Sequence, residues 1–350
     1  MNTQDAIAIA REWVQHVGSH QPGFKGAYLA GSVLTHPRLA PWPVSSDVDI
    51  MIISTKVQDK KLGKFIYKGL LLEVTTLDYR LFLQKETILA DYHVGYSFAH
   101  TIVLSDVDDV LVPLQTEVAR DFYHMEWVHR RCEHVKEKSI AGLTTIPTSA
   151  PFHEQVMSWL FPTGVLAHLF LTAALENPTV RKRYTAVQAV LKRYNMEDVH
   201  ETLLKQLRVE SLTKMTVQSS LDQLEETFVL AVEHAKTPFF FSTDVTHSAK
   251  PIVIEGSQLL INKNQFRESF FWIIATFCRC HIILAHDAPH LHEKRLPYFK
   301  QVLSSIGITT EKDLYSAALK TLSTVDYFWD HTRALIENNP DIIHEKKHGG

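Results

Sequence analysis

The 350-residue sequence contains few cysteines and no long apolar run, and its net charge is close to zero. Its three cysteines, Cys132, Cys278 and Cys280, are too few for a disulfide framework in a chain of this length, which indicates a reducing, cytoplasmic compartment. The first residues follow an amphipathic helical pattern that includes Asp5, and no basic segment leads into an apolar one. We therefore expect no signal peptide.

The most apolar stretch runs from Phe270 to Leu284 and is interrupted by Arg279 and His281. A membrane-spanning helix needs about 18 or more uncharged residues, so none is predicted. The 36 basic and 39 acidic residues give a net charge of −3. That balance creates no general field that would attract nucleic acid, and we expect no nucleic-acid partner. The sequence gives no indication of an oligomeric state.

The chain is 45% hydrophobic and 21% charged, as globular proteins are, and its length predicts about two domains. Up to residue 120, short apolar runs alternate with glycine and proline, which is typical of strands, and a Lys68-Gly69 turn predicts a hairpin. Helical patterns cover residues 5–17 and 81–92. Residues 1–120 should form an α/β domain with a small sheet.

From residue 121 to 345 the pattern is almost entirely helical and predicts an all-α bundle. One exception is the segment 239–261, which mixes β-prone runs with turn residues and is expected to form a long loop or a small hairpin. The predicted helices cover residues 117–138, 153–176, 182–194, 197–208, 217–236, 265–286 and 311–337.

Two acids, Asp47 and Asp49, precede the apolar run Ile50–Ile53. Because side chains alternate between the faces of a strand, both carboxylates should point the same way. Carboxylates held this close repel each other unless a cation lies between them, and Mg²⁺ is bound by one or two carboxylates together with water and phosphate oxygens. This spacing predicts a metal site at the start of a buried strand.

A glycine and a serine, Gly31-Ser32, follow another apolar strand and are expected to open a helix. A glycine there would let the backbone approach a phosphate closely, with N–H groups and the hydroxyl as donors. Ser46, directly before the acid pair, is a further candidate for contacting a nucleotide. Glu73 is flanked by apolar residues of a later strand and would be costly to bury unless it faced the same metal or a substrate hydroxyl. Its alternative role is an edge-strand carboxylate in water.

This combination resembles the polymerase-beta-like nucleotidyltransferase superfamily, in the small-molecule branch that includes the aminoglycoside nucleotidyltransferases. The resemblance rests on Gly31-Ser32, on SDVDIMII and on the later strand acid Glu73, and it covers residues 24–80. The segment TIVLSDVDDVLVPLQ resembles the strand that closes that catalytic domain. The sequence departs from the usual pattern in the spacer 33–46, which carries three prolines and lacks the second glycine common there.

The resemblance implies a mixed sheet, two Mg²⁺ ions, and transfer of a nucleoside monophosphate, with ATP as the expected donor, to a hydroxyl of a small molecule such as an aminoglycoside. Gly31 and Ser32 would hold the triphosphate, and Asp47 and Asp49 the metals. Glu73 would be the third metal ligand or the general base.

The helical half resembles that of the streptomycin-type adenylyltransferases, where basic residues reach the triphosphate. The residues that correspond here are Arg181, Lys182 and Arg183, with His168 at the place where an arginine is expected. The alternative is a solvated basic face with His168 in the core.

Other functions stay open. The His286-Asp287 dipeptide is typical of HD-type phosphohydrolases, and Cys278 and Cys280 could be metal ligands, although their spacing on a helix directs the sulfurs apart. An acceptor cleft could be lined by Phe239–Phe241 and by the tryptophans Trp127, Trp159, Trp272 and Trp329. The acids that could contribute to it are Asp78, Asp91, Glu117 and Glu154, which the sequence does not distinguish from one another. The protein could also be an inactive nucleotide-binding module, or it could act on a macromolecule.

Overall fold

The computed structural model describes residues 1–56 and 62–344, which form two compact units. Of the described residues, the first unit contains 1–56, 62–134, 172–179 and 336–344, and the second contains 135–171 and 180–335. The change of pattern near residue 120 predicts a single boundary there, with one domain over 1–120 and the other over 121–345. The division differs because Phe122 and Leu175 pack in the core beneath the sheet. The strand-like sequence patterns end at residue 120, but residues beyond 120 still contribute to the core beneath the sheet.

The first unit is built around a mixed sheet of five strands in the order β3-β4-β2-β1-β5. β2 and β4 are parallel, and the other neighbouring strands are antiparallel. The small mixed sheet is therefore confirmed. The strands are β1 (Phe24–Ala30), β2 (Val48–Ser54), β3 (Gly63–Tyr67), β4 (Leu70–Asp78) and β5 (Val103–Asp106).

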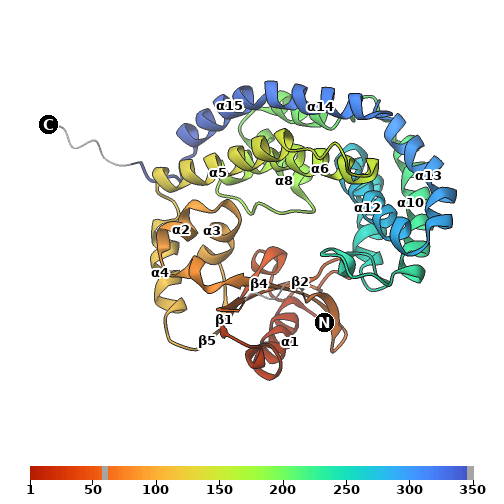
Figure 1. The fold of residues 1–350 in the computed structure, drawn as a ribbon. Coiled ribbons are helices and arrows are strands. Elements are labelled where there is room, and N and C mark those ends of the chain that lie inside the picture. The colour runs from red at the N-terminus through yellow and green to blue at the C-terminus, as the bar shows by residue number, and fades with distance from the viewer. Residues whose placement is uncertain (57–61, 345–350) are drawn as a thin grey trace. The chain divides into compact units, whose positions relative to one another are not determined.

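Helices cover both faces of this sheet (Figure 1). α1 (Thr3–His16) lies on one face, and α2 (Lys85–Ala90), α3 (Tyr92–Ala99) and α4 (Leu111–Asp121) lie on the other. Along β2, Ile50 faces the α1 side and Met51 the opposite side. A strand buried on both faces has apolar residues at every position, which explains the continuous run after Asp49.

The predicted hairpin is present between β3 and β4. Lys68 and Gly69 have φ values of 48° and 77°, and two consecutive positive φ angles are the mark of a type I′ turn. This turn fixes the pairing of Tyr67 with Leu70, and therefore of every residue pair behind it.

The remaining chain is helical. Predicted helices at 182–194, 197–208, 217–236 and 265–286 are all present, with small differences at their ends. The helices are α5 (Met125–Thr144), α6 (Phe152–Val165), α7 (Ala167–Ala173), α8 (Arg183–Arg193), α9 (Glu197–Gln206), α10 (Lys214–His234), α11 (Gly256–Asn262), α12 (Phe266–Asp287), α13 (Pro289–Ser304), α14 (Glu311–Ser323) and α15 (Val325–Asn338).

Three predicted helices are each divided in two, and the pattern at 81–92 corresponds to one shorter helix, α2, which follows a 3-10 turn at Tyr79–Phe82. α2 ends before Asp91, whose carboxylate caps α3 by accepting the N–H groups of His93 and Val94. The patterns at 117–138, 153–176 and 311–337 contain breaks between α4 and α5, α6 and α7, and α14 and α15. A break of one to three residues leaves the apolar periodicity almost unchanged, so periodicity alone does not reveal it.

The segment 239–261 forms no hairpin. It begins as a loop with a short 3-10 turn at Ser242–Asp244, and Pro251–Glu255 then form a π-helical turn that continues into α11. The β-branched residues Ile252, Val253 and Ile254 are buried there, so tertiary packing outweighs their strand propensity. α13 was not predicted, because its first turns are rich in histidine and charge.

Two stretches, Phe152–Ala173 and Phe266–Asp287, are long and apolar enough to cross a membrane by length and composition. Residues in both are mostly buried inside the protein, at 72% and 78% of the most apolar window. Core helices of soluble proteins have this character.

Candidate metal centre

Three acids from two adjacent strands meet at one place in the first unit. Asp47 lies directly before β2, Asp49 is its second residue, and Glu73 lies opposite Asp49 on the parallel strand β4. One carboxylate oxygen of each acid lies within 4.8 Å of the others, and all three residues are half-buried. The structure thus brings together the three acids that the sequence singles out.

Partial burial and mutual repulsion make this cluster unfavourable without a cation. Burial raises the pKa of Asp47, and the neighbouring Glu73 carboxylate raises that pKa further, while the Lys64 ammonium opposes both effects. Carboxylate oxygens are hard ligands that suit Mg²⁺. The donor set of Asp47, Asp49 and Glu73 therefore fits the metal that the resemblance implies.

Lys64 on β3 is one residue that sequence reasoning missed. Its Nζ lies 3.0 Å from Asp47 Oδ2 and also donates to Glu73 Oε2, and its side chain is only 9% exposed. The sequence contains the information that identifies Lys64, because the type I′ turn at Lys68-Gly69 sets the register that places Lys64 opposite Glu73. A positive charge is thus built into the acid cluster.

Gly31 contacts the cluster through its backbone. Its φ is +71°, and a Cβ atom placed on it would lie 1.8 Å from Asp49 Oδ2. β1 pairs with β2 so that Ala30 lies opposite Asp49, which brings the next residue against the carboxylate. Both the positive φ and the close approach require glycine at this position.

The turn after β1 is shorter than expected. Gly31–Leu34 form a single 3-10 turn rather than an α-helix, and Ser32 is exposed on it. Thr3 Oγ1 lies 2.7 Å from the Nδ1 atom of His36, which ties the proline-rich spacer to the start of α1. Ser46 is half-buried, and its carbonyl accepts from the Trp42 indole. Gly31 therefore lies against Asp49 in space, and Ser46 directly precedes Asp47 in the chain.

Asn177 is a second residue that the sequence did not identify. Its Nδ2 donates to the Gly31 carbonyl at 3.4 Å, and its segment, residues 172–179, belongs to the first unit. The two residues are 146 positions apart, so no local pattern connects them. The contact shows that the segment before Pro178 supports the Gly31 turn.

The basic candidates belong to the second unit, and two of them contact other residues of that unit. Arg183 is buried, donates from Nε to the Val180 carbonyl and lies over the Phe271 ring at 4.5 Å. Arg181 donates to the Val253 carbonyl at 3.4 Å, and Lys182 is exposed.

His168 is buried in α7 of the same unit. Because Arg183 is itself buried, it does not belong to a solvated basic face. A role for Arg181, Lys182, Arg183 or His168 at a nucleotide stays a prediction.

The competing metal sites have structural explanations. Asp287 accepts the backbone N–H groups of Lys236 and Thr237, which fixes the loop after α10. Cys278 and Cys280 are buried in α12, and burial raises the pKa of both thiols. Across residues 1–56 and 62–344, only the Asp47, Asp49 and Glu73 cluster brings three or more potential ligands close enough to hold one ion.

Comparison with known proteins adds no family to these observations. No protein-family model matches the chain, and a search of curated proteins finds no significant match.

Proposed function

We propose that this protein is a Mg²⁺-dependent nucleotidyltransferase that transfers a nucleoside monophosphate, with ATP as donor, to a hydroxyl group of a small molecule. One observation carries the proposal: Asp47, Asp49 and Glu73 converge from two parallel strands beside a glycine turn whose backbone touches Asp49. Nucleotidyl transfer requires negatively charged ligands for metal ions next to a place where a phosphate can approach the backbone.

The chain's own residues would perform three tasks. Asp47 and Asp49 would hold the metal, two ions being what the resemblance implies, and Gly31 and Ser32 would position the triphosphate by backbone N–H groups and a hydroxyl. Mg²⁺, when bound, neutralises charge on the phosphate oxygens. Glu73 would complete the ligand set or accept the proton of the attacking hydroxyl.

The proposed reaction is balanced with these groups alone. The acceptor oxygen forms a bond to the α-phosphorus of the nucleotide, and the bond from that phosphorus to the β-phosphate oxygen breaks. Pyrophosphate leaves with the bonding electrons, and the acceptor's proton passes to a carboxylate or to water. Arg181, Lys182, Arg183 and His168 remain candidates for binding the triphosphate.

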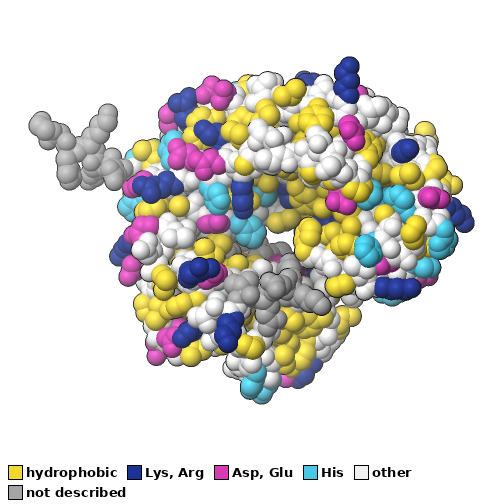
Figure 2. All heavy atoms as spheres, viewed as in Figure 1, with side chains coloured by type: hydrophobic (Ala, Val, Ile, Leu, Met, Phe, Trp, Pro, Cys, Tyr) yellow, Lys and Arg dark blue, Asp and Glu magenta, His cyan; other side chains and the backbone are white. Residues whose placement is uncertain are grey.

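The proposed acceptor is a small molecule, and the proposed compartment is the cytoplasm. On the face of the molecule in Figure 2, Lys and Arg side chains are scattered among Asp and Glu and form no continuous basic stripe. A macromolecular acceptor such as RNA would favour such a stripe. All three cysteines are buried thiols, which is compatible with a reducing compartment.

Lys64 supports a second candidate, a module that binds nucleotide without transferring it. Its ammonium contacts both Asp47 and Glu73, where a metal ion would otherwise supply the positive charge. A site that is neutralised internally in this way could bind a nucleotide without the metal that transfer needs.

The test is to incubate the purified protein with Mg²⁺ and [α-³²P]ATP against a panel of hydroxyl-bearing small molecules, including aminoglycosides. Label transfer and pyrophosphate release should both occur with at least one acceptor. Asp47→Ala should abolish both, because it removes a metal ligand at a strand end. Asp108→Ala, which removes an exposed carboxylate paired with Lys25, should change neither.

Two outcomes would contradict the proposal. Full activity of Asp47→Ala would remove the metal centre from the reaction. Nucleotide binding measured by calorimetry, without any pyrophosphate release across the panel, would instead favour the binding module.

A further inference from the structure

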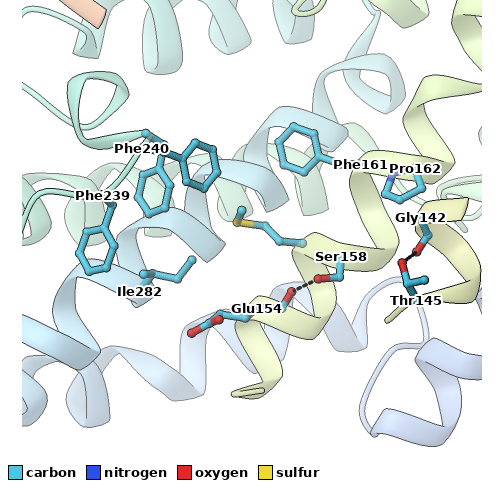
Figure 3. Close-up of a pocket in the computed structure, with 11 residues that line it drawn as sticks. Gly142, Thr145, Glu154, Ser158, Phe161, Pro162, Phe239, Phe240 and Ile282 are labelled. Carbon is cyan, nitrogen blue, oxygen red and sulfur yellow. Dashed lines mark hydrogen bonds between the residues drawn. The ribbon is translucent and has the colours of Figure 1, made fainter. Parts of the chain in front are cut away.

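The second unit contains a cavity of about 490 Å³ that lies apart from the acid cluster in sequence and chemistry (Figure 3). Its walls come from α5, α6, α12 and the loop after α10, all within residues 135–171 and 180–335. A cavity of this size falls in the range of small-molecule sites. None of its lining residues belongs to the acid cluster or to the residues proposed to bind the triphosphate.

Aromatic rings form much of the cavity wall. Phe239 and Phe241 are stacked, with ring centroids 5.5 Å apart and an interplanar angle of 5°, and Phe240 meets Phe241 edge-on at 5.1 Å. Phe161 joins them from α6. Phe240 is 74% exposed, which is unusual for an aromatic side chain in a globular protein and leaves its ring accessible at the wall.

The loop that carries these rings is anchored at both ends. Before them, Asp287 accepts the N–H of Thr237 at 2.9 Å and its hydroxyl at 2.6 Å. After them, Asp244 pairs with Arg279 at 3.1 Å, and the Arg279 guanidinium lies 5.6 Å from both the Phe161 and Phe241 rings. The aromatic wall is therefore built before any ligand arrives, which lowers the entropic cost of binding.

Glu154 is the one charged residue among those that line the cavity. It is half-buried, and within the described ranges no Lys, Arg or His forms an ion pair with its carboxylate. Its backbone carbonyl accepts from Ser158 Oγ at 3.0 Å, so the hydroxyl is directed to the helix rather than to the carboxylate (Figure 3). The positive charge of Arg279 is already matched by Asp244.

We propose that this cavity binds a small organic cation, specifically an amine carried on an aromatic or hydrocarbon body. The phenylalanine rings take the apolar body, the exposed Phe240 ring attracts the positive charge through its face, and the Glu154 carboxylate takes the ammonium group. An anion would face an unmatched carboxylate, and a neutral compound of the same shape would gain only the apolar contacts.

The experiment measures binding of three naphthalene derivatives, an amine, an alcohol and a carboxylate, to the full-length protein by isothermal titration calorimetry. 1-Naphthylmethylamine should bind about tenfold or more tightly than 1-naphthalenemethanol, and 1-naphthoate should bind most weakly. Glu154→Gln should lower the amine affinity to that of the alcohol and leave the alcohol affinity unchanged. Glu210→Gln, at an exposed glutamate outside the cavity, is the matched control and should change neither.

Phe240→Ala provides a second variant that does not depend on Glu154. Because the ring is largely exposed, its loss should leave thermal unfolding unchanged while it weakens amine binding about two- to fivefold. The proposal is overturned if the amine does not bind, if the three probes bind equally well, or if Glu154→Gln retains the preference for the amine. These measurements use no nucleotide, so their outcome is independent of nucleotidyl transfer.

Discussion

Replacing Gly31 by alanine should damage the acid cluster through a single added methyl group. The Cβ atom would lie 1.8 Å from Asp49 Oδ2, well inside van der Waals contact, so the carboxylate must move. The change should therefore lower both the free energy of unfolding and the affinity for a divalent metal ion. Gly69→Ala is a matched control, because Gly69 also has a positive φ, +77°, but its added Cβ would meet nothing within 4 Å.

The two variants separate two costs. A positive φ costs an L-residue about 1–2 kcal/mol, and this is the whole loss of unfolding free energy expected for Gly69→Ala. Gly31→Ala adds the strain of moving Asp49, on the order of 1–3 kcal/mol, as other overpacked sites show. Gly31→Ala should therefore cost about 2–5 kcal/mol. Metal affinity should fall about tenfold or more in Gly31→Ala only, because one ligand is displaced.

Urea unfolding of both variants gives the stabilities, and titration with Mn²⁺, followed by electron paramagnetic resonance, gives the metal affinities. The double variant Gly31→Ala/Asp49→Ala should recover part of the lost stability, because the carboxylate that the methyl group contacts is absent. The reasoning is refuted if Gly31→Ala and Gly69→Ala lose the same free energy and bind Mn²⁺ equally well.

Two further predictions concern buried titratable groups. Lys64→Met removes the cation beside Asp47 and Glu73 and should cost about 3–5 kcal/mol of unfolding free energy in the absence of metal. Millimolar Mg²⁺ should restore more stability to this variant than to the wild type. An equal effect of Mg²⁺ on the thermal unfolding of both proteins would contradict this prediction. Burial lowers the pKa of His281 to about 3 and that of His153 to about 4. At pH values below the ordinary histidine pKa of about 6.5, the unfolded chain therefore binds more protons than the folded chain. Stability should be complete above that pH and fall by about 1.4 kcal/mol per pH unit per histidine as the pH drops toward 4. Urea unfolding at pH 7.5 and 5 should show a smaller loss in His281→Phe, and an identical loss would count against this assignment.

The acid cluster shows which contacts a local sequence pattern predicts and which it does not. Alternation along one strand places Asp47 and Asp49 on the same side, and this follows from the sequence alone. That Glu73 joins them depends on β4 lying next to β2 in parallel, a pairing between strands that are not consecutive. The sequence marks Glu73 only as an acid among apolar residues, and the sheet order gives it its neighbours.

Lys64 and Asn177 were missed for different reasons. Lys64 lies in the same hairpin as Glu73, so counting back from the type I′ turn would have paired them. Asn177 reaches Gly31 from a segment 146 residues away, and only the folded chain reveals that contact. The basic residues after Pro178 stood out by charge, and the structure shows Arg181 and Arg183 donating to backbone carbonyls of their own unit, with Arg183 also over an aromatic ring.

The sequence by itself determined the class of each half, the hairpin with its turn, and the identity of three acids able to hold a metal. These features depend on side-chain periodicity and on local backbone preferences, which are determined by residues that are neighbours in the sequence. Only the tertiary structure decided that the sheet's core extends past residue 120, that Asp49 leaves no room for a side chain on Gly31, and that four phenylalanines and Glu154 line one cavity. Such features depend on contacts between residues far apart in the chain, which no local pattern records.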